Sequence, residues 1–307
     1  RRNSVNDAVV IHERQVLPRA VDHARDVALL TQRLGRGEIA SILVLDFANA
    51  FMSIPIAECE RPYNCTVVPE GLHRERTPLH SSEPAFGTCL LWRVLGFGGK
   101  PNPLVYARVA SFASRTAQAL LGLPDHRHQG KGARGRIQTY VDDPVISVAG
   151  RPHDVGRALD LVVLWWLVLG VPLSWKKGAI YEAGTKYVWI GVLYGLQANG
   201  LATMELPQKF INELLEQLAP LCSNKGTSTR KLVETVVGRT ARVAHVVPEA
   251  RPFSTAMYAA MSDFDRAKRA GSREAAPGRI PNKRFFASAR WIRALLEGSA
   301  DAPFLLE

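Results

Sequence analysis

The sequence predicts an α+β protein in which a strand-rich region is followed by a helical one. Three observations support this class. An apolar, β-branched run over 136–149 turns around two adjacent aspartates, which is typical of a β-hairpin. A continuous apolar run over 41–45 has strand length and indicates a strand covered on both faces. From Pro207 onward the apolar periodicity becomes helical.

The composition limits the class of protein before any motif is considered. The chain has 307 residues, 47% of them hydrophobic and 22% charged, which suffices for a sizeable core. Its formal net charge of +11 favours a polyanionic partner. The four cysteines form no C-x-x-C pair, which argues against a zinc site or a disulfide framework. Reduced thiols are the simplest account of these cysteines, so we expect an intracellular location, cytoplasmic or nuclear. No apolar run approaches the roughly 18 residues of a membrane span, so we expect no membrane partner.

The elements before the hairpin are a helix and a strand. Residues 20–34 have helical spacing, and Gly35 is suited to end that helix. The strand over 41–45 then delivers Asp46 at its end. An aspartate in this place is often only a turn residue, but the surrounding sequence, LDFANAF over 45–51 followed by SIPI over 53–56, is less generic.

Asp142 and Asp143 lie at the predicted tip of the hairpin. Two carboxylates this close raise each other's pKa, so the pair requires a cation or a basic cluster nearby. Carboxylate oxygens suit Mg²⁺, which completes its shell with water and substrate phosphates. The simpler alternative is an acidic turn, because Asp is common in turns.

A glycine-rich stretch, LGFGGKPNP over 95–103, precedes a helix predicted over 104–121. Gly98 and Gly99 would let the backbone approach a ligand closely, and a plain loop-to-helix junction explains these glycines equally well. Asn102 followed by Pro103 is a good N-cap and first helical residue. The basic, glycine-rich run over 126–136 is either a solvated loop or an arm that contacts nucleic-acid phosphates.

The region after the hairpin is mainly helical. Residues 154–169 are predicted to form a helix buried on most of its surface. Further helices are expected over 207–219, 228–247, 253–268 and 283–297, with a linker rich in Gly, Pro and Arg over 270–282. Basic side chains in this region either track a duplex backbone or lie on solvated helix faces: Lys225, Arg230, Lys231, Arg239 and Arg242.

Together these motifs resemble those of retroelement reverse transcriptases over roughly residues 14–260. The tetrapeptide YVDD over 140–143 is similar to the Y-x-D-D box, and residues 46–56 resemble motif A. Motifs B, D and E are matched in order by 95–103, by GVPLSWKK over 170–177 and by YVWIGVL over 187–193. The stretches LPR over 17–19 and IAECERP over 56–62 are similar to those of gypsy-like LTR retrotransposons.

The resemblance implies a right-hand polymerase fold. Its palm, an antiparallel sheet packed on helices with incomplete fingers, would span 1–200; a helical thumb would span 201–270, and a linker and C-terminal helix 271–307. Incomplete fingers are expected because only 16 residues precede Leu17. The implied activity is that of an RNA-directed DNA polymerase of a gypsy-type LTR or tyrosine-recombinase-encoding retrotransposon. It would act on dNTPs and a primed RNA or DNA template, with ribonuclease H, integrase or recombinase domains outside this chain.

The resemblance also implies roles for particular residues. Asp46, Asp142 and Asp143 would be catalytic, and Lys177 would donate a proton to the leaving pyrophosphate. These carboxylates and the backbone of Phe47 would hold two Mg²⁺ ions, or Mn²⁺ as a substitute. Phe51 would exclude a ribose 2′-hydroxyl. The other substrate-binding residues would be Phe47, Ala48, Asn49, Ala50, Gly98, Gly99, Lys100 and Tyr140, and the primer grip would contain Trp189 and Gly191.

Some positions depart from the family pattern. Gly96 and Asn102 replace the usual proline and small residue of motif B, Pro144 follows the aspartate pair in place of an aliphatic residue, and the segment 72–89 is longer. These departures leave open a decayed polymerase fold that binds or scaffolds nucleic acid. An RNA-templated polymerase of the viral replicative type is a third alternative, which would not favour an aromatic residue at 51 and which nucleotide choice would separate.

Overall fold

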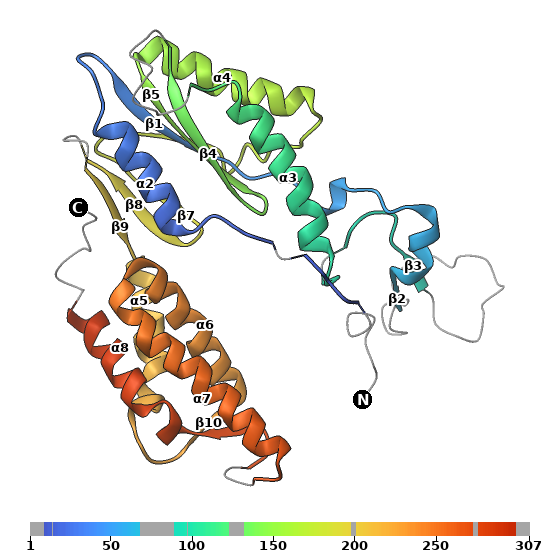
Figure 1. Cartoon of the computed structure of the whole chain (residues 1–307), viewed down its shortest axis with the longest axis vertical. Helices are drawn as coiled ribbons and strands as arrows, with labels where there is room; N and C mark the ends of the chain where they lie inside the picture. Colours follow the sequence, from blue (N-terminus) through green and yellow to red (C-terminus); the bar gives the residue numbers. More distant parts are fainter. Residues whose placement is uncertain are drawn as a thin grey trace.

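The computed structural model describes residues 9–13, 15–67, 89–96, 98–122, 132–197, 201–272 and 276–298. It has the predicted mixture of helices and antiparallel sheets. Figure 1 shows two regions along the long axis, one of sheets and helices and the other a helical bundle. The first occupies the place predicted for the palm and is called the palm below. The predicted long loop over 72–89 lies outside the described residues apart from the backbone at Cys89, and the basic run over 126–136 is described from 132 onward.

A four-stranded antiparallel sheet with the order β4-β5-β1-β6 forms the centre of the palm. Its strands are β4 (Arg134–Tyr140), β5 (Asp143–Gly150), β1 (Ile39–Val44) and β6 (Ala179–Glu182). Val44, at the end of β1, pairs with Val145 near the start of β5. Because the two strands are antiparallel, Asp46 leaves the sheet at the same end at which Asp142 and Asp143 enter it.

Both faces of this sheet are covered, as predicted for the apolar strand. Helices α3 (Asn102–Gln118) and α4 (Pro152–Val168) pack on one face with Leu43 and Ile146. Ile42 and Val145 belong to the core on the other face, because side chains alternate along a strand. That second core is formed with helix α2 (Ala20–Thr31) and with a further sheet of β7 (Lys186–Trp189), β8 (Val192–Leu196) and β9 (Ala202–Glu205).

Helix α4 is less buried than predicted. Val162 and Trp166 are fully covered, but Leu161, Leu164 and Val168 are 42%, 56% and 78% exposed. The helix is an outer layer of the palm, so one of its faces meets the sheet and α3 while the other meets solvent (Figure 1). The prediction was wrong because an apolar composition around the whole helix normally indicates full burial, and here it does not.

The second region is a bundle of helices α5 (Gln208–Leu218), α6 (Arg230–Val246), α7 (Arg251–Arg269) and α8 (Phe286–Gly298). Residues 202–205, which were expected to begin the thumb, instead form β9, so the bundle starts at Gln208. Helix α8 packs into this same bundle, with Trp291 stacked on Phe253 at a centroid distance of 3.8 Å. Figure 1 shows α8 beside α5 and α7.

Shorter elements complete the described chain. The strand pairs β2 (Cys65–Val67) with β3 (Cys89–Leu91) and β10 (Thr227–Thr229) with β11 (Arg279–Pro281) form two small antiparallel sheets of two strands each. The 3-10 turns are η1 (Phe51–Ser53), η2 (Glu58–Tyr63), η4 (Ala219–Cys222), η5 (Pro248–Ala250) and η6 (Asn282–Arg284). Within the described ranges, no helix has the length and apolarity that a membrane crossing requires.

Candidate active site

The ends of β1 and β5 bring Asp46, Asp142 and Asp143 together. The amide of Phe47 donates to the carbonyl of Asp142 at 2.8 Å, which ties the segment after β1 to the hairpin tip. The carboxyl groups of Asp143 and Asp46 lie within hydrogen-bonding distance of each other. The Asp46 side chain is only 12% exposed. Three acidic groups from distant positions in the sequence therefore share one end of the palm sheet.

Burial and the charges of neighbouring carboxylates raise the pKa values of Asp142 and Asp143. Burial, followed by the charges of Asp142 and Asp46, raises the pKa of Asp143 to about 6. The pKa of Asp142 is also raised, mainly by burial and further by Asp46. Lys177 donates to the Oδ1 atom of Asp46 at 2.9 Å, and this bond raises the pKa of Lys177. The cluster thus carries negative charge that one lysine offsets only in part.

The donor chemistry suits a divalent cation, although the arrangement is not that of a formed metal site. In the part of the chain that the structure describes, no group of His, Cys, Asp and Glu side chains has metal-site geometry. Lys177 pairs with the carboxylate that a cation would use. The donors are nevertheless carboxylate oxygens, which Mg²⁺ prefers. The pKa values of Asp142 and Asp143 are raised first by burial and then by neighbouring carboxylate charge, which a bound cation would offset.

Lys177 reaches Asp46 because the segment before it runs antiparallel to the segment after β1. Leu173 is bridged to Phe47, with the amide of Ala48 donating to Pro172 and the amide of Ser174 donating to Asp46, both at 2.8 Å. The side chain of Phe47 is buried and packs edge-on against Trp166. A substrate or metal contact by Phe47 would therefore involve its backbone.

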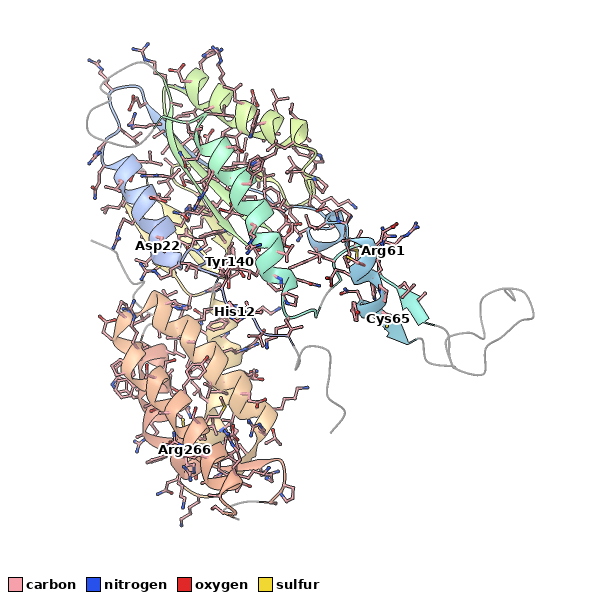
Figure 2. All side chains as sticks on the ribbon, turned by 45° about the vertical axis from the view of Figure 1, so that its right-hand side comes forward. His12, Asp22, Arg61, Cys65, Tyr140 and Arg266 are labelled. Carbon is pink, nitrogen blue, oxygen red and sulfur yellow. The ribbon has the colours of Figure 1, made fainter. Side chains whose placement is uncertain are left out.

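The hairpin tip has a strained backbone. Tyr140 pairs with Asp143, so Val141 and Asp142 alone form the turn. Val141 has a φ of 57°, which β-branched residues rarely adopt. Strain of this kind persists where the surrounding structure enforces it and is concentrated at active sites. Tyr140 is 37% exposed and lies at the end of the palm nearest the helical bundle (Figure 2).

A second turn follows Asp46. Asn49 has a φ of 51°, a left-handed conformation that asparagine tolerates. Ala50 is buried, and its carbonyl accepts the Ser53 hydroxyl at 2.6 Å. This turn leads into η1 and places Phe51 beside α3.

Phe51 lies against Tyr106, with the two rings 5.3 Å apart between centroids. Tyr106 is buried in α3, and its pKa is raised by burial and by the charges of Asp142 and Asp46. Tyr106 therefore lies close both to the predicted sugar-excluding residue and to the carboxylates. Sequence reasoning missed Tyr106; its signal is an aromatic residue at helical spacing from Ala110 and Ala113, on the face of α3 that is buried.

The hydrogen bond made by Asn102 in the motif B loop differs from the prediction. Asn102 does not cap α3, whose N-cap is Pro101. Its side-chain amide instead donates to the carbonyl of Gly96 at 2.7 Å. A Cβ atom on Gly99 would lie 2.5 Å from this amide, so the loop requires glycine there, and Gly98 has a φ of 91°. The predicted substrate residue Lys100 donates to the backbone of Val9 at 2.7 Å.

Trp189 and Gly191 belong to the β7–β8 hairpin. Trp189 is 2% exposed, so its side chain faces the core and cannot lie against a primer. Gly191 has a φ of 75°, and a Cβ atom there would lie 2.7 Å from a guanidinium nitrogen of Arg242 in α6. The backbone of the turn at 190–191 is thus the part of this hairpin that could meet a primer terminus.

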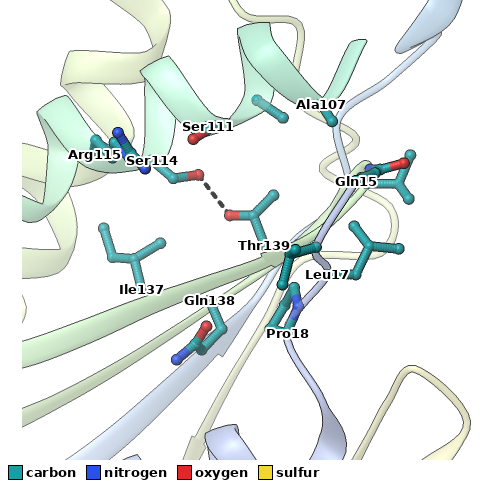
Figure 3. A pocket seen from close by; sticks show the side chains of 13 residues that line it. Gln15, Leu17, Pro18, Ala107, Ser111, Ser114, Arg115, Ile137, Gln138 and Thr139 are labelled. Atoms are coloured by element: carbon teal, nitrogen blue, oxygen red, sulfur yellow. Dashed lines mark hydrogen bonds between the residues drawn. The ribbon is translucent and has the colours of Figure 1, made fainter. Parts of the chain in front are cut away.

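A cavity of about 250 Å³ lies beside the β4–β5 hairpin, between α3, β4 and the segment before α2 (Figure 3). Its lining includes Gln15, Ser111, Ser114, Thr139 and Val141. The hydroxyl groups of Ser114 and Thr139 are hydrogen-bonded at 2.6 Å. The cavity adjoins the turn that carries Asp142 but does not contain the carboxylates.

An antiparallel sheet with carboxylates clustered where β1 ends and β5 begins is typical of the palm of a nucleic-acid polymerase. The reverse transcriptase (RNA-dependent DNA polymerase) family model matches residues 4–194. The match covers more than half of the 307 residues and includes Asp46, the Asp142–Asp143 pair, Lys177 and Trp189. The chain belongs to the reverse transcriptase family. A search of curated proteins found no match.

Asp143→Asn is expected to stabilise the cation-free protein at neutral pH. The pKa of Asp143 is about 6 in the fold against 3.8 for an ordinary aspartate. The folded state therefore binds more protons between these values, so stability falls as pH rises through this window and stays lower above it. Asparagine removes this loss. Since the Asp143 carboxyl group is half-exposed, we expect the substitution to raise the free energy of unfolding by about 1 kcal/mol and Tm by roughly 2 °C.

Thermal unfolding in a chelator at pH 4 and pH 7 measures this effect. Asp160→Asn, at an exposed position of α4, is the matched control with the same change in charge. Equal gains from the two substitutions at pH 7 would show that net charge, and not the carboxylate cluster, sets the stability.

Proposed function

We propose that this chain is the RNA-directed DNA polymerase of a retrotransposon, which transfers nucleotides from dNTPs to a primer 3′-hydroxyl. The convergence of Asp46, Asp142 and Asp143 in a member of the reverse transcriptase family carries the proposal. The net charge of +11 supports a nucleic-acid substrate. The stretches 17–19 and 56–62 support the gypsy-like or tyrosine-recombinase-encoding kinds.

Asp46, Asp142, Asp143 and the backbone of Phe47 would hold two Mg²⁺ ions. When bound, the ions would activate the primer hydroxyl and stabilise charge on the leaving pyrophosphate. Asp46 would then exchange its pairing with Lys177 for a cation. The Lys177 side chain is 66% exposed, so it has room to swing away and protonate the pyrophosphate.

Binding of the primer and template would involve the surfaces around this site. Phe51 would contact the sugar of the incoming nucleotide, and the turn at 190–191 would contact the primer terminus. In the bundle, Arg230 is paired with Asp265 and Arg239 with Glu213, so these two arginines have structural partners. The exposed basic residues of the bundle that remain candidates for phosphate contacts are Lys225, Lys231 and Arg242.

Primer extension on an RNA template with dNTPs and Mg²⁺ tests the proposal. We expect extension with Mg²⁺ or Mn²⁺ and none in a chelator. Binding of the primed template is measured in parallel at matched salt, because phosphate-dominated binding falls steeply with ionic strength. Binding without extension would indicate a decayed polymerase fold. Preferential use of rNTPs over dNTPs would instead indicate a polymerase of the viral replicative type.

A further inference from the structure

The side chain of Trp189 joins the β7–β8 hairpin to the start of β5. Its indole N–H donates to the main-chain carbonyl of Asp143 at 3.0 Å. Trp189 is 2% exposed and the bond is partly buried, so losing the donor would leave a partly shielded carbonyl with one partner fewer. The chemistry proposed above makes no use of this contact.

The contact matters because the residue after Asp143 is a proline. Pro144 has no N–H, so the peptide unit between Asp143 and Pro144 has a single hydrogen-bonding group, the carbonyl of Asp143. Pro144 lies in β5, which has neighbours on both sides, where proline removes a ladder bond. The amide of Leu45 donates to the carbonyl of Pro144 at 3.1 Å, but Pro144 cannot return the bond. The sheet therefore anchors this peptide unit weakly on the β1 side.

Aromatic neighbours fix the orientation of the Trp189 indole. The rings of His23 and Tyr194 lie 5.0 Å and 6.3 Å from it between centroids. The His23 Nε2 atom shares a hydrogen bond of 2.8 Å with the hydroxyl of Tyr187. Burial lowers the pKa of His23 to about 3, so the cluster is uncharged at neutral pH. The donor to Asp143 is thus held by closely packed, neutral side chains.

We propose that Trp189 is a positioning residue for Asp143 and that it compensates for Pro144. The indole N–H anchors, from the carbonyl side, the peptide unit that proline leaves without a donor. It thereby sets where the Asp143 carboxylate lies relative to Asp46. The consequence for catalysis rests on the proposed function, whereas the consequence for cation binding does not.

A double-mutant cycle of Trp189→Phe and Pro144→Leu tests this coupling. Mn²⁺ binding to the protein alone is measured by electron paramagnetic resonance, and kcat and KM by primer extension. Partners of metal ligands typically contribute 10- to 100-fold to affinity. We expect Trp189→Phe to weaken Mn²⁺ binding about 10-fold beside Pro144 and about 2-fold in the Pro144→Leu background. The kcat value should fall in parallel, with the KM for the primed template unchanged.

Trp165→Phe is the matched control. The Trp165 indole is partly buried and donates to the hydroxyl of Thr116 at 2.9 Å, where α4 packs on α3. It should cost similar stability and leave Mn²⁺ binding unchanged. If Trp189→Phe does not fold, 3-benzothienylalanine at position 189 keeps the shape of the indole and removes only the N–H.

Two results would overturn the inference: equal weakening of Mn²⁺ binding in both Pro144 backgrounds, or equal weakening by Trp165→Phe. An unaltered chain that fails to extend primers but shows the expected Mn²⁺ cycle would refute the proposed function and support the positioning role. If the unaltered chain extends primers but Trp189→Phe changes neither Mn²⁺ binding nor kcat, the proposed function is supported and the positioning role is refuted.

Discussion

Replacing Asp142 with asparagine should lower the rate of nucleotide addition by a factor on the order of 10³. Asparagine keeps the shape of the side chain but removes the charge that would hold a cation at the start of β5. Losing a single preorganised group that stabilises transition-state charge typically costs about 10² to 10³, and a lost metal ligand belongs at the upper end. Single-nucleotide incorporation under single-turnover conditions measures the change directly.

Asp142→Asn should leave binding of the primed template within about twofold at matched salt, because one charge in a chain of net charge +11 changes the total only slightly. Asp160→Asn on the outer helix α4 controls for that charge and should retain full activity. More than a tenth of the original rate in Asp142→Asn would exclude Asp142 as a ligand of the reacting ions.

Local patterns predicted the elements of this site, and a family resemblance predicted that they meet. The strand before Asp46 and the hairpin around Asp142 are visible as short apolar runs with the right period. Nothing in those runs shows that the two come together, because the pairing of Val44 with Val145 spans about a hundred residues. The order of the motifs supplied that information.

The side-chain contacts were harder to predict, since their direction depends on tertiary packing. Asn102 has the sequence signature of a helix cap, but its amide bonds Gly96 across the loop. Trp189 belongs to the motif expected to contact a primer, yet its indole bonds Asp143 inside the palm. In both cases a polar group near a functional loop joins two backbone segments, and neither partner is adjacent in the sequence.

The structure gives Phe51 the support that a steric filter requires. Its ring leans on Tyr106, which is 3% exposed and fixed within α3. The charges of Asp46 and Asp142 both influence Tyr106, so the aromatic pair lies close to the carboxylates. A ring held in this way can exclude one additional hydroxyl by contact, without a hydrogen bond.

Phe51→Ala should therefore allow ribonucleotides to be used, with the dNTP-to-rNTP ratio of kcat/KM falling on the order of 10²-fold. Steric discrimination by a single group in a packed site has about this magnitude. The measurement is single-nucleotide incorporation of matched dNTP and rNTP substrates on one primed RNA template. Phe112→Ala, which truncates a 59% exposed phenylalanine on the outer side of α3, is the matched control and should not change the ratio. An unchanged ratio in Phe51→Ala would remove Phe51 from the sugar site and assign nucleotide choice to another residue near Asp46.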